Sequence, residues 1–186
     1  MLNMVIKKGK PVVLLHGWGQ NIEMMNPIGK GLEKDYRIII LDLPGFGKSS
    51  EPTYGYIIYD YDKYICRYAI ENDIPLLGIC LGMQIMANSI ELNKVNHNNI
   101  THKINTIGTS IISKIVGNCY VNSRHNFHVT DIGNYKVSAY SEDGIIEAIE
   151  YPSKKFNVGV QWHPEDMIDF DVKQFNLFKE FIKATK

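Results

Sequence analysis

A buried strand that ends in a Gly-x-Cys-x-Gly turn constrains this chain more than any other feature of its sequence. The apolar run PLLGI at 75–79 is typical of a strand buried on both faces, and it leads through Gly78-Ile79-Cys80-Leu81-Gly82 into the helical pattern MQIMANSIEL. So sharp a strand-to-helix turn needs small neighbours, which let the central side chain project from the edge of a sheet. The pattern therefore predicts a nucleophile elbow with Cys80 at its tip.

A thiol in this position can be activated by its surroundings. The helix that starts at Leu81 directs its N-terminal dipole at the sulfur and stabilises a thiolate, and the Leu81 N–H can face a developing oxyanion. A thiolate also needs a base. The segment GVQWHPE at 159–165 has a strand pattern that delivers His163 and, two residues later, Glu165, which could orient the imidazole.

Strands and helices alternate over the first ninety residues, which predicts a parallel sheet with right-handed crossovers. The second half instead shows short strands separated by turn signals, including Glu142-Asp143-Gly144, and then an amphipathic helix. We expect an α/β fold, with 1–186 as a single three-layer, doubly wound domain that has a mostly parallel, flavodoxin-like sheet and an added antiparallel hairpin region. The expected strands are 12–17, 37–45, 75–79, 119–123, 136–141, 145–151 and 158–163, and the expected helices are 21–34, 59–72 and 172–182, besides the one after the elbow.

Charge and hydropathy exclude several classes of function. The 186 residues carry 20 basic and 20 acidic side chains, so the formal net charge is zero and offers no electrostatic footprint for nucleic acid or an anionic membrane. No run approaches the roughly 18 apolar residues of a membrane span, and the first ten residues lack the apolar core of a signal peptide. We expect a cytoplasmic protein that binds neither nucleic acid nor membrane.

The three cysteines, Cys66, Cys80 and Cys119, are an odd number without C-x-x-C pairing, which argues against a disulfide framework or a zinc site. Cys66 and Cys119 are expected to be small core residues. Two histidines in a turn-rich segment, His125 and His128, are expected to be surface or packing residues. No metal and no cofactor is predicted.

The segment PLLGICLGMQ, followed some eighty residues later by VGVQWHPE, resembles the class I glutamine amidotransferase family, and particularly its γ-glutamyl hydrolase branch, peptidase family C26. The resemblance covers about residues 59–186 and implies the class I amidotransferase-like α/β fold. It also implies a Cys-His-Glu triad that attacks a γ-glutamyl amide, with Cys80 as nucleophile, His163 as general base and then acid, and Glu165 holding the imidazole. The expected partner is a small γ-glutamyl compound, and a homodimer is left open.

The same resemblance implies substrate-binding residues. Gln84 matches the family position that contacts the substrate glutamyl group. Asn122, Ser123 and Arg124 are further candidates for holding its α-amino and α-carboxylate groups, since the fork of an arginine suits a carboxylate.

The first part of the chain has a different likeness. PVVLLHGWGQN followed by RIIILDLPGFGKSSEP resembles the α/β-hydrolase family over about residues 11–58. No G-x-S-x-G occurs anywhere in the chain, so a serine hydrolase is not expected. The sequence indicates a join near 59–61, between a hydrolase-like strand-helix-strand fragment at 1–58 and an amidotransferase-like portion at 59–186.

This join leaves two questions open. The second oxyanion donor is the N–H of Trp18 if the first strand lies beside the Cys80 strand, which is the favoured arrangement, and that of Gly45 if the second strand lies there. The chain is predicted to hydrolyse a γ-glutamyl amide through a thioester. The alternative is a recombined or engineered chimeric α/β scaffold with little or no activity.

Overall fold

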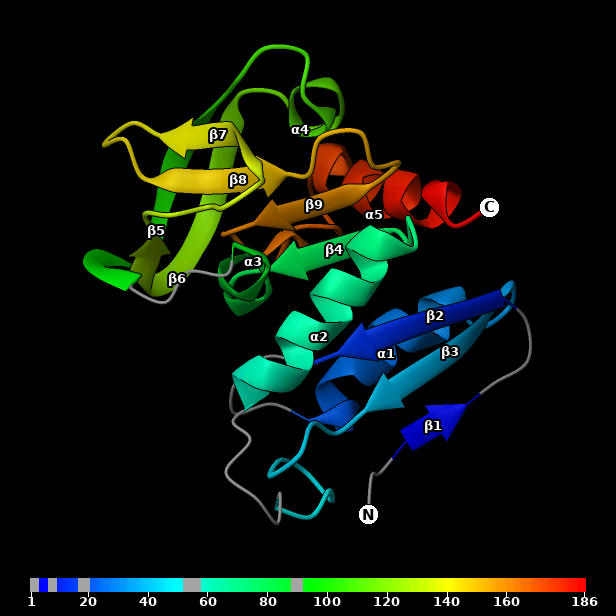
Figure 1. Cartoon of the computed structure of the whole chain (residues 1–186). Helices are drawn as coiled ribbons and strands as arrows, with labels where there is room; N and C mark the ends of the chain where they lie inside the picture. The colour runs from blue at the N-terminus through cyan, green and yellow to red at the C-terminus, as the bar shows by residue number, and fades with distance from the viewer. Residues whose placement is uncertain (1–3, 7–9, 17–20, 52–57, 88–91) are drawn as a thin grey trace. The chain divides into compact units, whose positions relative to one another are not determined.

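A computed structural model describes residues 4–6, 10–16, 21–51, 58–87 and 92–186 of the chain (Figure 1). The chain divides into two compact units, residues 1–61 and 62–186. The division falls close to the join predicted at 58/59, whereas the expected single domain stays a prediction.

Unit 1 is a small strand-helix-strand layer. Its sheet has the order β1-β3-β2, with β2 parallel and β1 antiparallel to β3. Ile38 and Ile40 of β3 are buried, and a Cβ at Gly29 would lie only 3.1 Å from Ile40 Cδ1, so this glycine lets α1 approach the sheet closely. The elements are β1 (Met4–Ile6), β2 (Lys10–Leu15), α1 (Ile22–Leu32) and β3 (Tyr36–Leu41).

Unit 2 holds a six-stranded sheet in the order β4-β9-β8-β7-β5-β6. The β4–β9 pair is parallel and the remaining pairs are antiparallel, so the pairing is mixed. The expected α/β class and the added antiparallel region are both confirmed. α2 (Ile58–Glu71) begins just before the division and precedes β4. The other elements are β4 (Leu76–Ile79), α3 (Leu81–Met86), β5 (Leu92–Thr106), α4 (Ile111–Ile115), β6 (Cys119–Val129), β7 (Lys136–Ser141), β8 (Ile146–Glu150), β9 (Asn157–Val160), the 3₁₀ turn η1 (Pro164–Asp166) and α5 (Val172–Ala184).

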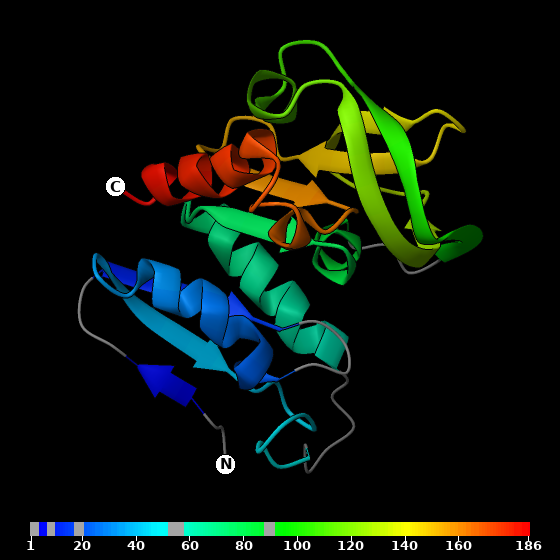
Figure 2. The same cartoon turned by 180° about the vertical axis from the view of Figure 1, so that it is seen from behind.

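Helices cover both faces of the β4–β9 part of this sheet (Figures 1 and 2). Because side chains alternate along a strand, Ala148 packs into the core under α5, whereas Ile149 packs into the core under α2 and α3. Leu177 anchors α5 and is fully buried. None of the helices in the described ranges is long and apolar enough to cross a bilayer.

Two facing glycines seat α3 on the sheet. Gly78 of β4 and Gly159 of β9 are register partners. A Cβ at Gly78 would lie 2.8 Å from the Gly82 carbonyl carbon, and one at Gly159 would lie 2.7 Å from Met83 Cγ. A side chain at either position would press against α3, so the two glycines let this helix lie close to the sheet.

The helix after the elbow is shorter than the sequence predicts. The pattern MQIMANSIEL indicated a helix to residue 92, but α3 ends at Met86 and β5 begins at Leu92. β5 is rich in Asn, His and Lys, which are weak strand formers, so local propensity gave no sign of it. Its backbone is instead satisfied by the long antiparallel ladder with β6.

Candidate active site

Cys80 lies at the tip of a strained turn between β4 and α3. Its φ of 52° and ψ of −106° fall where a side chain other than glycine is disfavoured. The Cys80 N–H donates to the Val160 carbonyl at 2.8 Å, which fixes the turn to the end of β9. This is the backbone geometry that the predicted nucleophile elbow requires.

His163 and Glu165 form a close pair just beyond the end of β9. His163 Nδ1 lies 2.6 Å from Glu165 Oε1, and the two side chains are 15% and 25% exposed. The 3₁₀ turn that begins at Pro164 brings the carboxylate back toward the ring. Because β4 and β9 are parallel neighbours, this pair and Cys80 lie at the same edge of the sheet.

The surroundings of His163 favour its protonated form. Burial lowers the pKa of the imidazole, but hydrogen bonding to Cys80 and to Glu165 outweighs it and raises the pKa from 6.5 to about 9. Since Nδ1 donates to Glu165, Nε2 remains for the Cys80 sulfur. The arrangement brings a cationic imidazole and the Cys80 sulfur together, which is the pairing that nucleophilic cysteine catalysis uses.

Gln161 is a site residue that the sequence analysis did not single out. Its side chain is fully buried, its Nε2 donates to Cys80 Sγ at 3.6 Å, and its Oε1 accepts from Gln84 Nε2 at 3.1 Å. Gln84 Nε2 also donates to the Phe127 carbonyl at 3.1 Å. Gln84 therefore acts within the protein as a support for Gln161, and its contact with a substrate stays a prediction. The expected strand at 158–163 carried a signal, because Gln161 and His163 would share a face on it. In the structure β9 ends at Val160 and both residues follow it.

The three consecutive candidates on β6 do not gather at one place. Asn122 exchanges two hydrogen bonds of 3.0 Å with the backbone N–H and carbonyl of His163. Arg124 forms an ion pair with Asp166, and its Nη2 lies 4.0 Å from Glu165 Oε1.

Ser123 points to the opposite face of β6 because side chains alternate along a strand. It is buried, and its hydroxyl donates to the His97 carbonyl at 2.6 Å. The structure therefore brings Asn122 and Arg124 to the histidine–glutamate pair but leaves Ser123 away from it.

Of the predicted oxyanion donors, Leu81 is the first residue of α3 and follows Cys80 directly. Trp18 lies outside the described residues. Gly45 belongs to the other unit, and its N–H donates to the Ser50 carbonyl at 3.2 Å within its own loop. To act as the second oxyanion donor, the Gly45 N–H would have to give up its hydrogen bond to Ser50. The identity of the second donor stays a prediction.

The other two cysteines are core residues, as predicted. None of the three cysteines, all of which lie in the described part of the chain, forms a disulfide. Cys66 packs against the core under α2 and α3, and Cys119 against the core under α5. Burial raises the pKa of the Cys119 thiol, which makes it a poor nucleophile.

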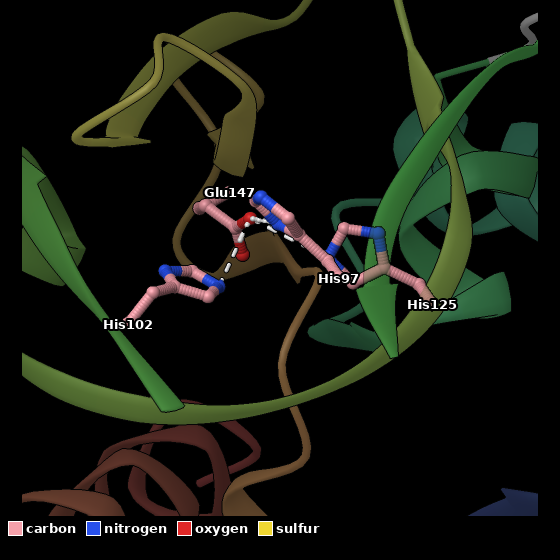
Figure 3. Close-up of side chains that lie close together, drawn as sticks. All are labelled: His97, His102, His125 and Glu147. Atoms are coloured by element: carbon pink, nitrogen blue, oxygen red, sulfur yellow. Dashed lines mark ion pairs between the residues drawn. The ribbon is translucent and has the colours of Figure 1, made fainter. Parts of the chain in front are cut away.

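Unit 2 holds a second group of titratable side chains that the sequence analysis missed (Figure 3). His97, His102 and His125 surround Glu147 on β5, β6 and β8, and their ligand atoms all lie within 4.8 Å of one another. We call these four residues the histidine cluster. His125, expected at the surface or in packing, is buried here. Among the described residues, these four are the group that could hold a metal ion.

Comparison with known proteins identifies the relatives of this chain. A glutamine amidotransferase-like protein of Rickettsia prowazekii is 32% identical over 184 aligned positions, which cover 68% of this chain and 65% of the relative. The CTP synthase of Mycoplasma mycoides subsp. mycoides SC is 35% identical over 160 positions, which cover 63% of this chain and 30% of that enzyme. The chain thus spans less than two thirds of the length of these relatives.

Solved structures with the same fold are more distant in sequence. The glutaminase domain of Trypanosoma brucei CTP synthase with bound acivicin has a TM-score of 0.70 and 16% identity, over 95% of this chain and 93% of that one. A glutamine amidotransferase of Methylobacillus flagellatus has a TM-score of 0.66 and 13% identity, over 97% and 96%. The sequence profile of the Peptidase C26 family matches residues 59–165, more than half of the chain. The chain therefore belongs to the peptidase C26 family of class I glutamine amidotransferase-type proteins.

Proposed function

We propose that this chain hydrolyses a γ-glutamyl amide through a thioester on Cys80. The observation that carries the proposal is the position of His163, which couples to Cys80 on one side and to Glu165 at 2.6 Å on the other. A nucleophile, a base and a group that orients the base are the three parts that covalent acyl transfer requires.

In the first half of the reaction, the Cys80 thiolate attacks the γ-carbonyl carbon of the substrate. A tetrahedral oxyanion forms, and the N–H of Leu81, the first residue of α3, can donate to it. The C–N bond then breaks, His163 donates its proton to the departing nitrogen, and the amine or ammonia leaves. The product on the enzyme is a γ-glutamyl thioester.

In the second half, neutral His163 removes a proton from water while the oxygen attacks the thioester carbonyl. The C–S bond breaks, glutamate leaves, and the thiolate and imidazolium are restored. Glu165 keeps the ring in one tautomer throughout, and Asn122 holds the backbone of His163 through its two hydrogen bonds. Gln161 donates to the sulfur and stabilises its negative charge.

The glutamyl character of the substrate rests on the relatives, whose names describe glutamine amidotransferases and a glutaminase domain. Arg124 is the cationic side chain beside the histidine–glutamate pair, and it is 45% exposed. We assign it to the outer rim of the substrate site, where it can attract the α-carboxylate while Asp166 holds it in place.

Glutamate release from glutamine and from γ-glutamyl amides of simple amines tests the proposal. The wild type is expected to release glutamate, and Cys80→Ala is expected to release none above background. Cys66→Ala, which removes a core thiol, serves as the control and should retain activity. Equal rates for wild type and Cys80→Ala would overturn the assignment.

A second candidate is a joined α/β scaffold with little or no activity. Two observations favour it: the Peptidase C26 match begins at residue 59, and the compact units divide at Tyr61. A rate loss of roughly 10²- to 10³-fold follows from one missing oxyanion donor, so a misplaced loop would give a folded but nearly inactive protein. Cooperative unfolding without glutamate release would support this candidate, and efficient turnover would exclude it.

A further inference from the structure

The histidine cluster is built around one carboxylate oxygen (Figure 3). Glu147 Oε1 lies 3.4 Å from His97 Nδ1, 3.4 Å from His102 Nε2 and 3.5 Å from His125 Nε2. The glutamate side chain is fully buried, and the three imidazoles are 6%, 12% and 2% exposed. Solvent therefore cannot satisfy these four groups.

The outward nitrogen of each ring has an oxygen acceptor. His97 Nε2 lies 2.9 Å from Asp143 Oδ2, and His125 Nδ1 lies 3.0 Å from the Phe127 carbonyl. His102 Nδ1 lies 3.4 Å from the Lys103 carbonyl. A neutral imidazole that donates from its outward nitrogen presents a lone pair from the other one. Three lone pairs thus point at a carboxylate.

This arrangement is costly without a positive charge at its centre. None of the three inner nitrogens and neither oxygen of Glu147 has a hydrogen-bond partner. Each buried polar group without a partner is destabilising, and a charged one more so. We propose that the histidine cluster binds one divalent transition-metal ion of the zinc type, with His97 Nδ1, His102 Nε2, His125 Nε2 and Glu147 as its ligands.

The spacing fits such an ion. Ligand atoms at Zn–N and Zn–O distances of about 2.0–2.1 Å in a tetrahedral site lie about 3.3–3.4 Å apart. The three nitrogen–oxygen distances to Glu147 are 3.4, 3.4 and 3.5 Å, and all four ligand atoms lie within 4.8 Å of one another. Three imidazoles and a carboxylate suit Zn²⁺ and its first-row neighbours better than Mg²⁺ or Ca²⁺, which prefer oxygen ligands.

Asp143 completes the site as an outer partner. A carboxylate on the far nitrogen of a metal-bound histidine fixes its tautomer and raises its basicity as a ligand. Asp143 also supplies a second negative charge, so that with Glu147 it balances the two charges of the metal. Four buried protein ligands leave no open position, which is typical of a structural rather than a catalytic zinc site.

A bulge in β5 makes the cluster. His97 and His102 are five residues apart, so on a regular strand they would point to opposite faces. The register against β6 shifts by one between Asn98 and Ile100, and Asn99 at the shift has a φ of 56°. The extra residue returns both histidines to one face. His125 is the direct cross-strand partner of His97.

Zinc binding by the metal-free full chain tests the proposal, with competition against a chromophoric chelator as the measurement. We expect one Zn²⁺ per chain, lost in His125→Asn and Glu147→Gln. Asp143→Asn should weaken binding by roughly 10- to 100-fold. Since the Asp143 side chain is 56% exposed, that variant can be made without disturbing the core.

Two control variants locate the metal. His128→Asn, on the same strand as His125, and Cys80→Ser, in the proposed active site, should both keep the full stoichiometry. Cobalt substitution should give a visible spectrum without a thiolate-to-cobalt band. The proposal is overturned if the wild type binds no stoichiometric metal, if Asp143→Asn binds as tightly as wild type, or if Cys80→Ser removes the site.

Discussion

Unit 2 brings histidine and glutamate side chains together at two places, and the distance from imidazole nitrogen to carboxylate oxygen differs between the two. In the proposed active site, His163 Nδ1 and Glu165 Oε1 are 2.6 Å apart, which is a charge-assisted hydrogen bond. In the histidine cluster, three imidazole nitrogens stand 3.4–3.5 Å from one oxygen of Glu147. The first distance leaves room for a proton between the groups, and the second leaves room for a metal ion. On the two proposals made above, the same residue types serve proton transfer at one place and cation binding at the other.

The largest expected effect on this comparison is the loss of activity when the pairing of Glu165 with His163 is weakened. Glu165→Gln keeps the shape of the side chain but loses the charge that orients and stabilises the His163 imidazolium. We expect kcat on a γ-glutamyl amide to fall by roughly 10²- to 10⁴-fold, with zinc content unchanged. Steady-state kinetics and metal analysis of the same samples check this.

Asp166→Asn is the matched control for that variant. Asp166 neighbours Glu165 in the chain but pairs with Arg124 rather than with the imidazole. Its replacement should change KM more than kcat. If Glu165→Gln and Asp166→Asn reduced kcat equally, the orienting role of Glu165 would be wrong.

A smaller effect is expected on the stability of the chain when metal is removed from the histidine cluster. At a free Zn²⁺ concentration of about 1,000 times the Kd of the cluster, metal binding would add about 4 kcal/mol to the free energy of unfolding. A strong chelator should therefore lower the Tm of the wild type, and added Zn²⁺ should restore it. In His125→Asn the Tm should respond to neither reagent, because the ligand set is already broken.

The smallest effect concerns pH. The pKa of His163 is raised from 6.5 to about 9 in the folded chain, so folding favours the imidazolium. The stability that this charge contributes is fully present below pH 6.5 and is lost as the pH rises through about 9. The difference in unfolding free energy between wild type and His163→Asn, measured in urea, should shrink over this range.

The ionisation of His163 should also control turnover. We expect kcat/KM to fall at alkaline pH as His163 loses its proton near pH 9. Glu165 contributes to the raised pKa of His163, so in Glu165→Gln the fall in kcat/KM should move to lower pH. A fall at the same pH as in the wild type would argue against the assignment to His163.

The sequence predicted the active site better than the cluster, for a physical reason. Cys80, His163 and Glu165 are found through short local patterns: a strand with glycines at its turn, and a spacing of two residues after a strand. Parallel pairing of β4 with β9 then joins the two patterns. The supporting role of Gln161 was missed although Gln161 stands only two residues before His163 in the same segment.

The histidine cluster has no such local pattern. Its four residues come from three strands, and one of these strands, β5, was not predicted from the sequence. Two of the ligands share a face only because Asn99 inserts a bulge, which depends on pairing with β6. Tertiary pairing rather than local spacing creates the site. The sequence analysis accordingly expected no metal.

Covalent trapping tests the proposed active site most directly. A glutamine analogue that carries an electrophilic carbon in place of the γ-amide should form an adduct with the wild-type chain. Peptide mapping by mass spectrometry distinguishes the three cysteines, and Cys66 and Cys119 serve as internal controls. We predict a single adduct on Cys80, lost in Cys80→Ala and slowed in Glu165→Gln. Labelling of Cys66 or Cys119 at the same rate, or an adduct that persists in Cys80→Ala, would contradict the account.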